Sequence, residues 1–198
     1  MLPKYINVFI CGGSQGAFNL NQKLMALFMK ISEILFQTLE KYGISTHYLD
    51  TFPERIMSCK KVKIIPVEVV VRNVAAGSIV RQTTLEEGKI INWPLVEYYL
   101  KDDDKDDPLL TIDRINLMGY GNELSVLEYQ AREINSILRS TFRKIGLTLV
   151  DFKLEFGRVD IEGKKEIILA DEISPDTCRL WDVVSEKKLD KDRFRKDL

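Results

Sequence analysis

The stretch between Leu149 and Asp182 constrains the fold more than any other part of the sequence, because it combines two apolar runs with regularly placed charges. Apolar and charged residues alternate from Val150 to Phe156, which is the period of a β-strand. We expect one face of this strand to carry Val150, Phe152, Leu154 and Phe156, and the other to carry Asp151, Lys153 and Glu155.

A β-hairpin is predicted to follow this strand. Gly157 and Gly163 bracket a polar turn, and a second apolar run, Ile167–Ala170, ends in Asp171. The hairpin would bring Asp171 back beside the charged face of the first strand. Two carboxylates suit a divalent metal that carries phosphate oxygens, and a lysine between them suits a phosphate. Arg179 follows a Ser-Pro-Asp turn and could bind another phosphate or a carboxylate.

The same alternation of charges also has a purely structural explanation, which the pattern leaves open. An edge strand with a solvated face often alternates charges, and a lysine between two acids makes good cross-strand pairs. Trp181 and Phe152 favour the site slightly, because they would give the charged groups a stiff apolar backing.

The apolar pattern from Lys60 to Asn73 predicts two strand segments separated by Pro66. Both faces of the second segment are partly apolar, so we expect it inside a sheet. Arg72 at its end is followed by small residues up to Ser78, and an arginine with a serine can bind a phosphate through charge and hydroxyl. The alternative is a tight strand-to-helix turn in which Ser78 caps the helix.

Two amphipathic helices are predicted, over Asn21–Tyr42 and Glu123–Ile145. Their apolar stripes are Leu24, Leu27, Phe28, Ile31, Leu35 and Leu39 in the first, and Leu124, Leu127, Ala131, Ile134, Leu138 and Phe142 in the second. The only histidine, His47, lies in a short Thr-His-Tyr segment. A structural role is favoured for it over a catalytic one.

Composition excludes several classes of function. With 198 residues, 45% of them apolar, the chain can bury a proper core, and its net charge of −1 gives no basic field for nucleic acid. The three scattered cysteines lack zinc-site spacing and favour a reduced cytosolic setting. The sequence holds no run of 18 apolar residues, so no membrane span is predicted. The aspartates of Asp102–Asp107 do not have the spacing of an EF-hand calcium loop. This acidic loop is the best candidate for a boundary between two halves of the chain.

Four segments in a fixed order resemble the signatures of the SAICAR synthetase family, which are the phosphoribosylaminoimidazole-succinocarboxamide synthases. They are VEVVVRNVAAGS (67–78), LVDFKLEFG (149–157), LADEISPDTCRLWD (169–182) and LDKDRFR (189–195), with YYLKDDDKDDP (98–108) between the first two. The resemblance implies an α+β fold with two lobes, mostly antiparallel sheets and flanking helices, related to ATP-grasp. Residues 1–65 would form an N-terminal nucleotide lobe, and residues 66–198 a C-terminal ATP-grasp-like substrate and metal lobe.

The activity that this resemblance implies is a ligation in de novo purine biosynthesis. The family joins L-aspartate to carboxyaminoimidazole ribonucleotide through an acyl phosphate, and ATP becomes ADP and phosphate. The expected cofactors are therefore ATP and Mg²⁺, and the expected location is the cytoplasm. The family commonly forms homo-oligomers, so the resemblance also implies a homo-oligomer.

Site residues follow from the resemblance position by position. Lys153 and Asp151 would be catalytic, with Lys153 on phosphate oxygens or the reacting carboxylate and Asp151 orienting the ribonucleotide. Glu155 and Asp171 would hold Mg²⁺ on the nucleotide. The residues that would bind or line the substrate are Arg72, Ser78, Lys101, Asp103, Asp107, Arg179, Lys191 and Arg195. The backbone of Val62–Ile65, including Ile64, would read the edge of adenine.

The N-terminal region departs from the family. A Gly-Lys-Ala-Lys phosphate loop is expected there, but residues 11–16 read CGGSQG without a lysine, so we expect the nucleotide lobe to be incomplete. This departure favours an alternative, an inactive nucleotide- or ribonucleotide-binding module of the same fold. A kinase or another ATP-grasp-type carboxylate ligase is a third option, against which Arg72, Ser78 and Arg179 argue by implying a phosphorylated co-substrate.

Overall fold

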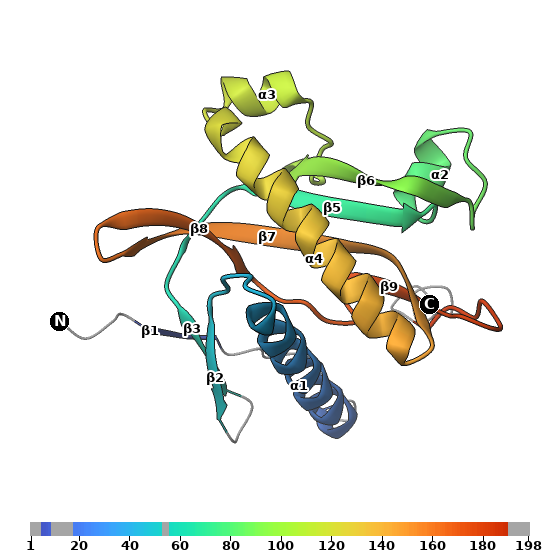
Figure 1. Cartoon of the computed structure of the whole chain (residues 1–198), viewed down its shortest axis with the longest axis horizontal. Coiled ribbons are helices and arrows are strands. Elements are labelled where there is room, and N and C mark those ends of the chain that lie inside the picture. The colour runs from blue at the N-terminus through green and yellow to red at the C-terminus, as the bar shows by residue number, and fades with distance from the viewer. Residues whose placement is uncertain (1–4, 9–17, 53–55, 190–198) are drawn as a thin grey trace.

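The computed structural model describes residues 5–8, 18–52 and 56–189 (Figure 1). Its strands are β1 Tyr5–Val8, β2 Tyr48–Phe52, β3 Ile56–Lys60, β4 Lys63–Ile64, β5 Val67–Val74, β6 Ile90–Leu100, β7 Leu147–Ile161, β8 Lys164–Ala170 and β9 Cys178–Asp182. Its α-helices are α1 Phe18–Lys41, α2 Ser78–Gln82, α3 Ile112–Leu117 and α4 Leu124–Lys144, and its 3-10 helices are η1 Asp103–Lys105 and η2 Gly121–Glu123.

The 15-residue strand β7 organises the larger of two antiparallel sheets. This sheet has the order β4-β7-β5-β6, and β8 and β9 also pair with β7. The smaller sheet has the order β1-β3-β2. In Figure 1, α4 crosses in front of β5 and β7, while α1 lies beside β2. The expected mix of helices with antiparallel sheets is confirmed.

The apolar face of β7 packs into the main core. Phe152, Leu154 and Phe156 are at most 1% exposed, and Leu149 joins them in that core. Val150 was expected on the same face, and that expectation is wrong. The pairing of β7 with β9 shifts register between Leu149 and Asp151, and this bulge places Val150 in a separate cluster with Val74, Ala76 and Trp181.

The hairpin between β7 and β8 is confirmed, but its turn is shorter than expected. Gly157 lies within β7, where it pairs with Ile168 of β8. The turn is formed by Glu162 and Gly163, both with positive φ (52° and 82°), as two-residue hairpin turns require. Gly157 is needed for another reason: a Cβ atom there would lie 2.4 Å from a methyl carbon of Val62.

The second strand segment after Pro66 lies inside the sheet, as predicted. β5 pairs with β6 on one side and with β7 on the other, and Val67, Val69 and Val71 are fully buried. The strand therefore needs apolar residues on most positions. Its polar exceptions, Glu68, Arg72 and Asn73, are all less than 10% exposed.

The helix α4 is confirmed with its stripe, because Leu127, Ala131, Ile134, Leu138 and Phe142 are buried. The stripe predicted for α1 is only partly right. Leu35 and Leu39 are buried, but Leu27 is 54% exposed. The buried face also holds Met29, Ser32 and Phe36, so it is rotated relative to the prediction. Ser32 is accommodated there because its hydroxyl donates to the carbonyl of Ile173 at 2.8 Å.

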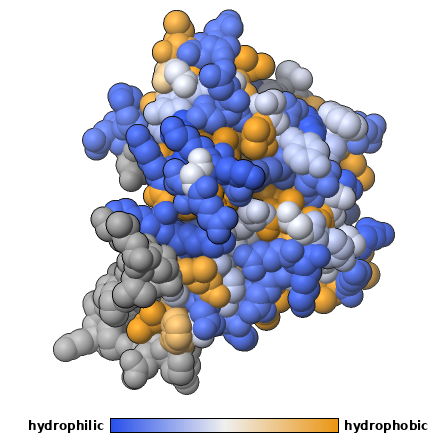
Figure 2. Space-filling model, turned by 60° about the vertical axis from the view of Figure 1, so that its left-hand side comes forward, coloured by the Kyte–Doolittle hydropathy of each residue, from blue (hydrophilic) through white to orange (hydrophobic). Residues whose placement is uncertain are grey.

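The face of the molecule shown in Figure 2 is mostly hydrophilic. In the view of Figure 2, hydrophobic residues are scattered among hydrophilic ones. None of the described helices is long and apolar enough to cross a membrane. Cys59 and Cys178 are buried free thiols, and Cys11 lies outside the described residues.

We predict that Phe152→Ala lowers the free energy of unfolding by about 3–5 kcal/mol, because it empties a fully enclosed position of the main core. Phe52→Ala is the matched control, since Phe52 is 49% exposed. Denaturant unfolding of the two variants provides the measurement. Similar losses in both variants would contradict the assignment of the faces of β7.

Candidate functional site

A cavity of about 280 Å³ lies over the charged face of β7. It is lined by Glu68, Val70, Arg72, Ser78, Tyr99, Asp107, Asp151, Phe152, Lys153, Thr177, Cys178 and Arg179. Half of these positions were predicted as site residues from the sequence: Arg72, Ser78, Asp107, Asp151, Lys153 and Arg179. The cavity therefore brings together segments that are far apart in the chain.

Asp151 lies between two guanidinium groups. Its side chain is 4% exposed, and its Oδ2 atom accepts from Nη1 of Arg72 at 3.0 Å and from Nη1 of Arg179 at 2.9 Å. The three residues come from β7, β5 and β9, and cross-strand register places them side by side. A buried carboxylate is tolerated only when such partners compensate its charge.

Arg72 is buried, and each of its five N–H groups has a partner. Nε donates to Glu97 at 2.5 Å, and Nη1 donates to Asp151 and to the carbonyl of Ala76. Nη2 donates to the hydroxyls of Ser78 at 2.8 Å and Tyr99 at 3.2 Å. Burial would lower the pKa of Arg72, but these carboxylate and hydroxyl contacts raise it above the ordinary value. Arg72 thus fixes the geometry of its neighbours.

The turn after β5 brings Gly77 against Arg179 and Ser78 against Arg72. The residue at the N-cap of α2 is Gly77 rather than Ser78, so the capping alternative for Ser78 is wrong. Gly77 has φ 66°, and a Cβ atom there would lie 2.7 Å from Nη2 of Arg179. Glycine at this position lets the guanidinium approach the backbone.

Lys153 connects the acidic groups of the cavity. Its Nζ donates to Glu68 at 2.7 Å and to Glu155 at 3.1 Å. Burial alone would lower the pKa of Lys153, but the hydrogen bond to Glu68 and the nearby carboxylate charges raise it. Lys101 also donates to Glu155, at 2.5 Å, and lies 4.0 Å from Glu68. Lys153 is therefore held as a cation, and it shares Glu155 with Lys101.

The hairpin brings Asp171 to Glu155, as the sequence predicted. Glu155 pairs with Ala170, and Asp171 follows directly in the left-handed region with φ 59°. Although Asp171 as a whole is exposed, desolvation and then the charge of neighbouring Glu155 raise the pKa of its carboxyl group to about 6. Two neighbouring carboxylates that repel each other suit a hard divalent cation.

The acid pair is not extended by further ligands. Across residues 5–8, 18–52 and 56–189, no group of three or more histidine, cysteine, aspartate or glutamate residues is arranged to hold a metal ion. A metal at Glu155 and Asp171 would therefore need oxygen atoms from a bound phosphate or from water to complete its coordination.

The acidic loop contributes unevenly to this site. Oδ1 of Asp107 accepts the backbone N–H of Asp102 at 2.8 Å, and Asp107 lines the cavity. Lys101 forms an ion pair with Glu155 on β7. Asp103 lies in η1, and only its backbone is described. Lys191, Arg195 and residues 11–16 lie outside the described residues.

The segment predicted to read adenine runs beside β7. Ile64 pairs with Gly157, and the side chain of Val62 packs against that glycine. The N–H of Ile65 donates to the carbonyl of Phe156 at 2.9 Å, and the carbonyl of Ile65 accepts from Val67 at 2.7 Å. Both backbone groups of Ile65 are thus already engaged within the protein.

His47 has a structural setting, as favoured from the sequence. Its ring packs edge-on against Phe36, with centroids 5.4 Å apart. Burial lowers the pKa of His47 to about 4; the backbone of Asp171 opposes this shift and Lys60 adds to it. The imidazole is therefore neutral near pH 7.

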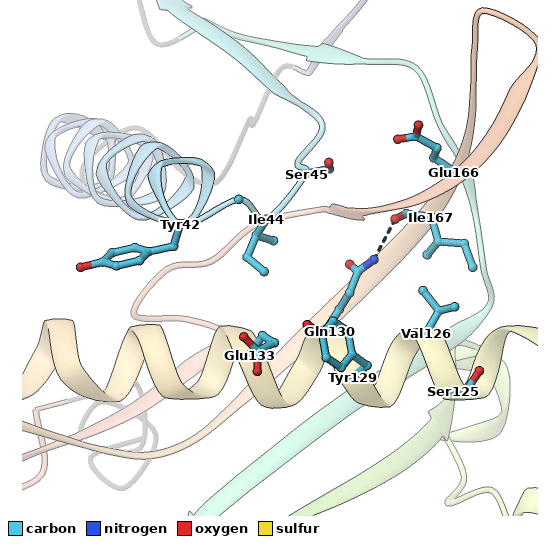
Figure 3. Close-up of a pocket in the computed structure, with 11 residues that line it drawn as sticks. Tyr42, Ile44, Ser45, Ser125, Val126, Tyr129, Gln130, Glu133, Glu166 and Ile167 are labelled. Atoms are coloured by element: carbon cyan, nitrogen blue, oxygen red, sulfur yellow. Dashed lines mark hydrogen bonds between the residues drawn. The ribbon is translucent and has the colours of Figure 1, made fainter.

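A second cavity of about 580 Å³ lies between the end of α1, α4 and β8 (Figure 3). Tyr42, Ile44, Val126, Tyr129 and Ile167 are among its lining residues, and Nε2 of Gln130 donates to the carbonyl of Ile167 at 3.0 Å. It contains none of the predicted site residues. Its size does not make it the site, because the convergent charged groups lie in the smaller cavity.

Sequence reasoning missed four polar residues of the smaller cavity or its support: Glu68, Tyr99 and Thr177, which line it, and Glu97, which supports Arg72. Glu97 and Tyr99 are two residues apart on β6 and both contact Arg72. Their spacing places them on one face of a strand, which was a usable signal. The signal for Glu68 was a carboxylate within an otherwise apolar strand.

Comparison with known proteins identifies close relatives. The sequence profile of the SAICAR synthetase family matches residues 19–198. The phosphoribosylaminoimidazole-succinocarboxamide synthase of Wolinella succinogenes is 52% identical over 176 residues, covering 87% of this chain and 73% of that protein. The one from Chlorobium chlorochromatii is 54% identical over 170 residues, covering 85% and 71%.

Solved structures give the same result. A SAICAR synthetase in complex with ADP matches with a TM-score of 0.83 and 42% identity, covering 87% of this chain and 73% of that structure. The SAICAR synthetase of Pyrococcus horikoshii OT3 matches with a TM-score of 0.82 and 42% identity, covering 87% and 75%.

We predict that His47 destabilises the folded chain in acid. The unfolded chain binds a proton near pH 6.5, whereas the folded chain resists it until about pH 4, so stability falls as pH drops through that window. The loss should be on the order of 2 kcal/mol. Chemical unfolding of wild type and His47→Gln at pH 7 and pH 4.5 measures it. The variant should lose less stability than wild type, and parallel pH profiles would refute this account.

Proposed function

Because this chain belongs to the SAICAR synthetase family of ATP-dependent ligases in purine biosynthesis, we propose that its smaller cavity is where L-aspartate is joined to carboxyaminoimidazole ribonucleotide. The observation that carries this proposal is the convergence of Asp151, Lys153 and Arg179 with Arg72 and Ser78 around one cavity. A phosphorylated, carboxylated substrate needs such a mixture of cations and a fixed carboxylate.

The ribonucleotide would contact Arg179 directly. The side chain of Arg179 is 20% exposed, whereas that of Arg72 is 3% exposed and has its N–H groups engaged. We therefore assign Arg72 to positioning Asp151 and Ser78, and Arg179 to the phosphate or a nearby polar group. Asp151, held by both arginines, would orient the aminoimidazole.

ATP would bind on the side of Glu155 and Asp171. A relative of this chain is known in complex with ADP, which supports a nucleotide site in the family. The acid pair fits Mg²⁺, because its oxygen atoms are hard ligands and its mutual repulsion would be relieved by a cation. When bound, the ion would neutralise charge on the nucleotide phosphates. The backbone of Val62–Ile65 is the proposed contact for adenine; because both backbone groups of Ile65 are engaged within the protein, the contact is assigned to Val62–Ile64.

The chemistry requires charge neutralisation more than covalent help from the protein. A carboxylate is a poor electrophile, so the γ-phosphoryl group first converts it to an acyl phosphate, which the amine of aspartate then attacks. Lys153 and Lys101, both cationic, lie where they can compensate the charge on phosphate oxygens. Asp107 lines the same cavity, in which this reaction is proposed to occur.

The lobe organisation belongs to the proposal as well. We assign residues 1–65 to a nucleotide lobe and residues 66–198 to a substrate and metal lobe related to ATP-grasp. Strand β4, Lys63–Ile64, pairs with Arg158 and Gly157 of β7, so this boundary crosses a continuous sheet. A cytoplasmic location and a homo-oligomer are proposed on the same family basis.

Release of ADP tests the proposed function. The assay contains Mg-ATP, L-aspartate and carboxyaminoimidazole ribonucleotide, and each substrate is omitted in turn. Release that requires both co-substrates is expected. Binding of the ribonucleotide without release would select the inactive module, and release that ignores aspartate would select another ligase or a hydrolase.

We predict that Asp171→Asn lowers kcat/KM for Mg-ATP on the order of 100-fold, because it removes one ligand of the proposed ion. Glu172→Gln, at the neighbouring position, is the matched control and should stay close to wild type. Titration with Mg²⁺ at fixed ATP provides the measurement. An Asn variant with wild-type Mg²⁺ dependence would remove Asp171 from the metal site.

Arg179→Ala is expected to raise the KM for the ribonucleotide at least about 10-fold more than the KM for ATP, because a charge-assisted contact to one substrate is lost. Arg139→Ala, on the exposed side of α4, is the control. Steady-state kinetics with each substrate varied separately tests this. Equal changes in both constants would defeat the assignment of Arg179.

A further inference from the structure

Glu68 is a buried carboxylate for which the family resemblance supplied no role. It lies on β5, is 7% exposed and lines the smaller cavity. Its Oε1 atom accepts from Nζ of Lys153 at 2.7 Å, and Nζ of Lys101 lies 4.0 Å away. Its Oε2 atom accepts no hydrogen bond from the described part of the chain. One oxygen is therefore available to a ligand in the cavity.

The surroundings of Glu68 make it a stronger base than an ordinary glutamate. Burial raises its pKa, Lys153 lowers it, and the charges of Glu155 and Asp107 raise it again, with a net upward shift. Lys101 adds a second cation nearby. In the register of β5 with β6, Tyr99 is the residue opposite Glu68, and its hydroxyl is engaged by Arg72 and Glu97.

Charged groups of both signs line the cavity. Arg72 and Arg179 hold Asp151, whereas Glu68, which accepts from Lys153, and Asp107 provide the other two carboxylates of the lining. Of the two co-substrates, the ribonucleotide carries charged groups that are all anionic, whereas L-aspartate carries an ammonium group beside its two carboxylates. A buried carboxylate with an unoccupied oxygen complements an ammonium and disfavours a phosphate.

We propose that Glu68 forms the subsite for the amine of L-aspartate and acts as the base that accepts a proton from it. This inference rests on the proposed function, because it assumes that the cavity holds the acyl phosphate. It assigns a residue to the amino group of L-aspartate, for which the family resemblance named none.

The protons balance when aspartate attacks the acyl phosphate. The ammonium group transfers one proton to the Glu68 carboxylate and becomes a neutral amine with a free electron pair. The amine nitrogen attacks the carbonyl carbon of the acyl phosphate, the C–N bond forms and the C–O bond to phosphate breaks. The nitrogen loses a second proton, which leaves with the phosphate as hydrogen phosphate. Glu68 then returns its proton to solvent.

A competing explanation is that Glu68 only holds Lys153 in place. In that case its loss would impair formation of the acyl phosphate, and any acceptor would suffer equally. Hydroxylamine separates the two explanations, because it is uncharged near neutral pH and attacks acyl phosphates without first giving up a proton. It replaces aspartate as acceptor and yields a hydroxamate.

The experiment compares wild type, Glu68→Gln and Glu68→Asp in ADP release with carboxyaminoimidazole ribonucleotide and either aspartate or hydroxylamine. For Glu68→Gln we expect kcat with aspartate to fall about 100-fold and ADP release with hydroxylamine to fall less than about 3-fold. Glu68→Asp, which keeps the carboxylate, should recover part of the aspartate rate. Glu133→Gln, an exposed carboxylate on α4, is the control and should match wild type.

Each outcome decides between the explanations. Equal losses with both acceptors would overturn the assignment and leave Glu68 as a support for Lys153. Unchanged aspartate kinetics in Glu68→Gln would also overturn it. A wild-type chain that releases no ADP with aspartate would overturn the proposed function itself. Thermal unfolding of Glu68→Gln and the hydroxylamine rate together show whether the variant is folded.

Discussion

The buried carboxylate of Asp151, held between two arginines, is the interaction on which the rest of the site depends. It joins β5, β7 and β9, because Arg72 and Arg179 reach it from strands on either side. An isolated charge at this depth would be strongly unfavourable, so the three residues must be present together. The same pairing that stabilises this part of the sheet also fixes the direction in which Arg179 faces the cavity.

The charged face of β7 continues this arrangement along the strand. Asp151, Lys153 and Glu155 project on one side, and each is compensated by a residue from a neighbouring element. In the proposed function, Arg179 would bind the phosphate or another polar group of the ribonucleotide, and the acid pair at Glu155 and Asp171 would hold a metal-bound nucleotide. The long strand would then set the spacing between the ribonucleotide and ATP.

Sequence reasoning recovered the parts of the site that follow from local periodicity. The alternation from Asp151 to Glu155 identified the charged face, and the hairpin placed Asp171 beside Glu155. Local patterns do not reveal a β-bulge, so Val150 was placed in the wrong cluster. They also do not reveal close approaches between distant segments, which explains why Gly157 was taken for part of a turn.

The role of Arg72 illustrates the same limit. Its sequence context predicts a residue that binds phosphate, yet its N–H groups are distributed over Glu97, Tyr99, Ser78, Asp151 and the carbonyl of Ala76. These partners come from three elements and the turn after β5, so the network becomes visible only when the sheet is assembled. The stripe of α1 was misplaced for a related reason, because the core that it faces is formed by residues distant in sequence.

A crystal structure of the chain with Mg-ADP and carboxyaminoimidazole ribonucleotide would test the central claim most directly. The account predicts the ribonucleotide in the cavity beside Asp151 and Arg179, with the metal between Glu155 and Asp171. A ribonucleotide in the larger cavity between α1, α4 and β8, or a metal remote from that acid pair, would contradict it.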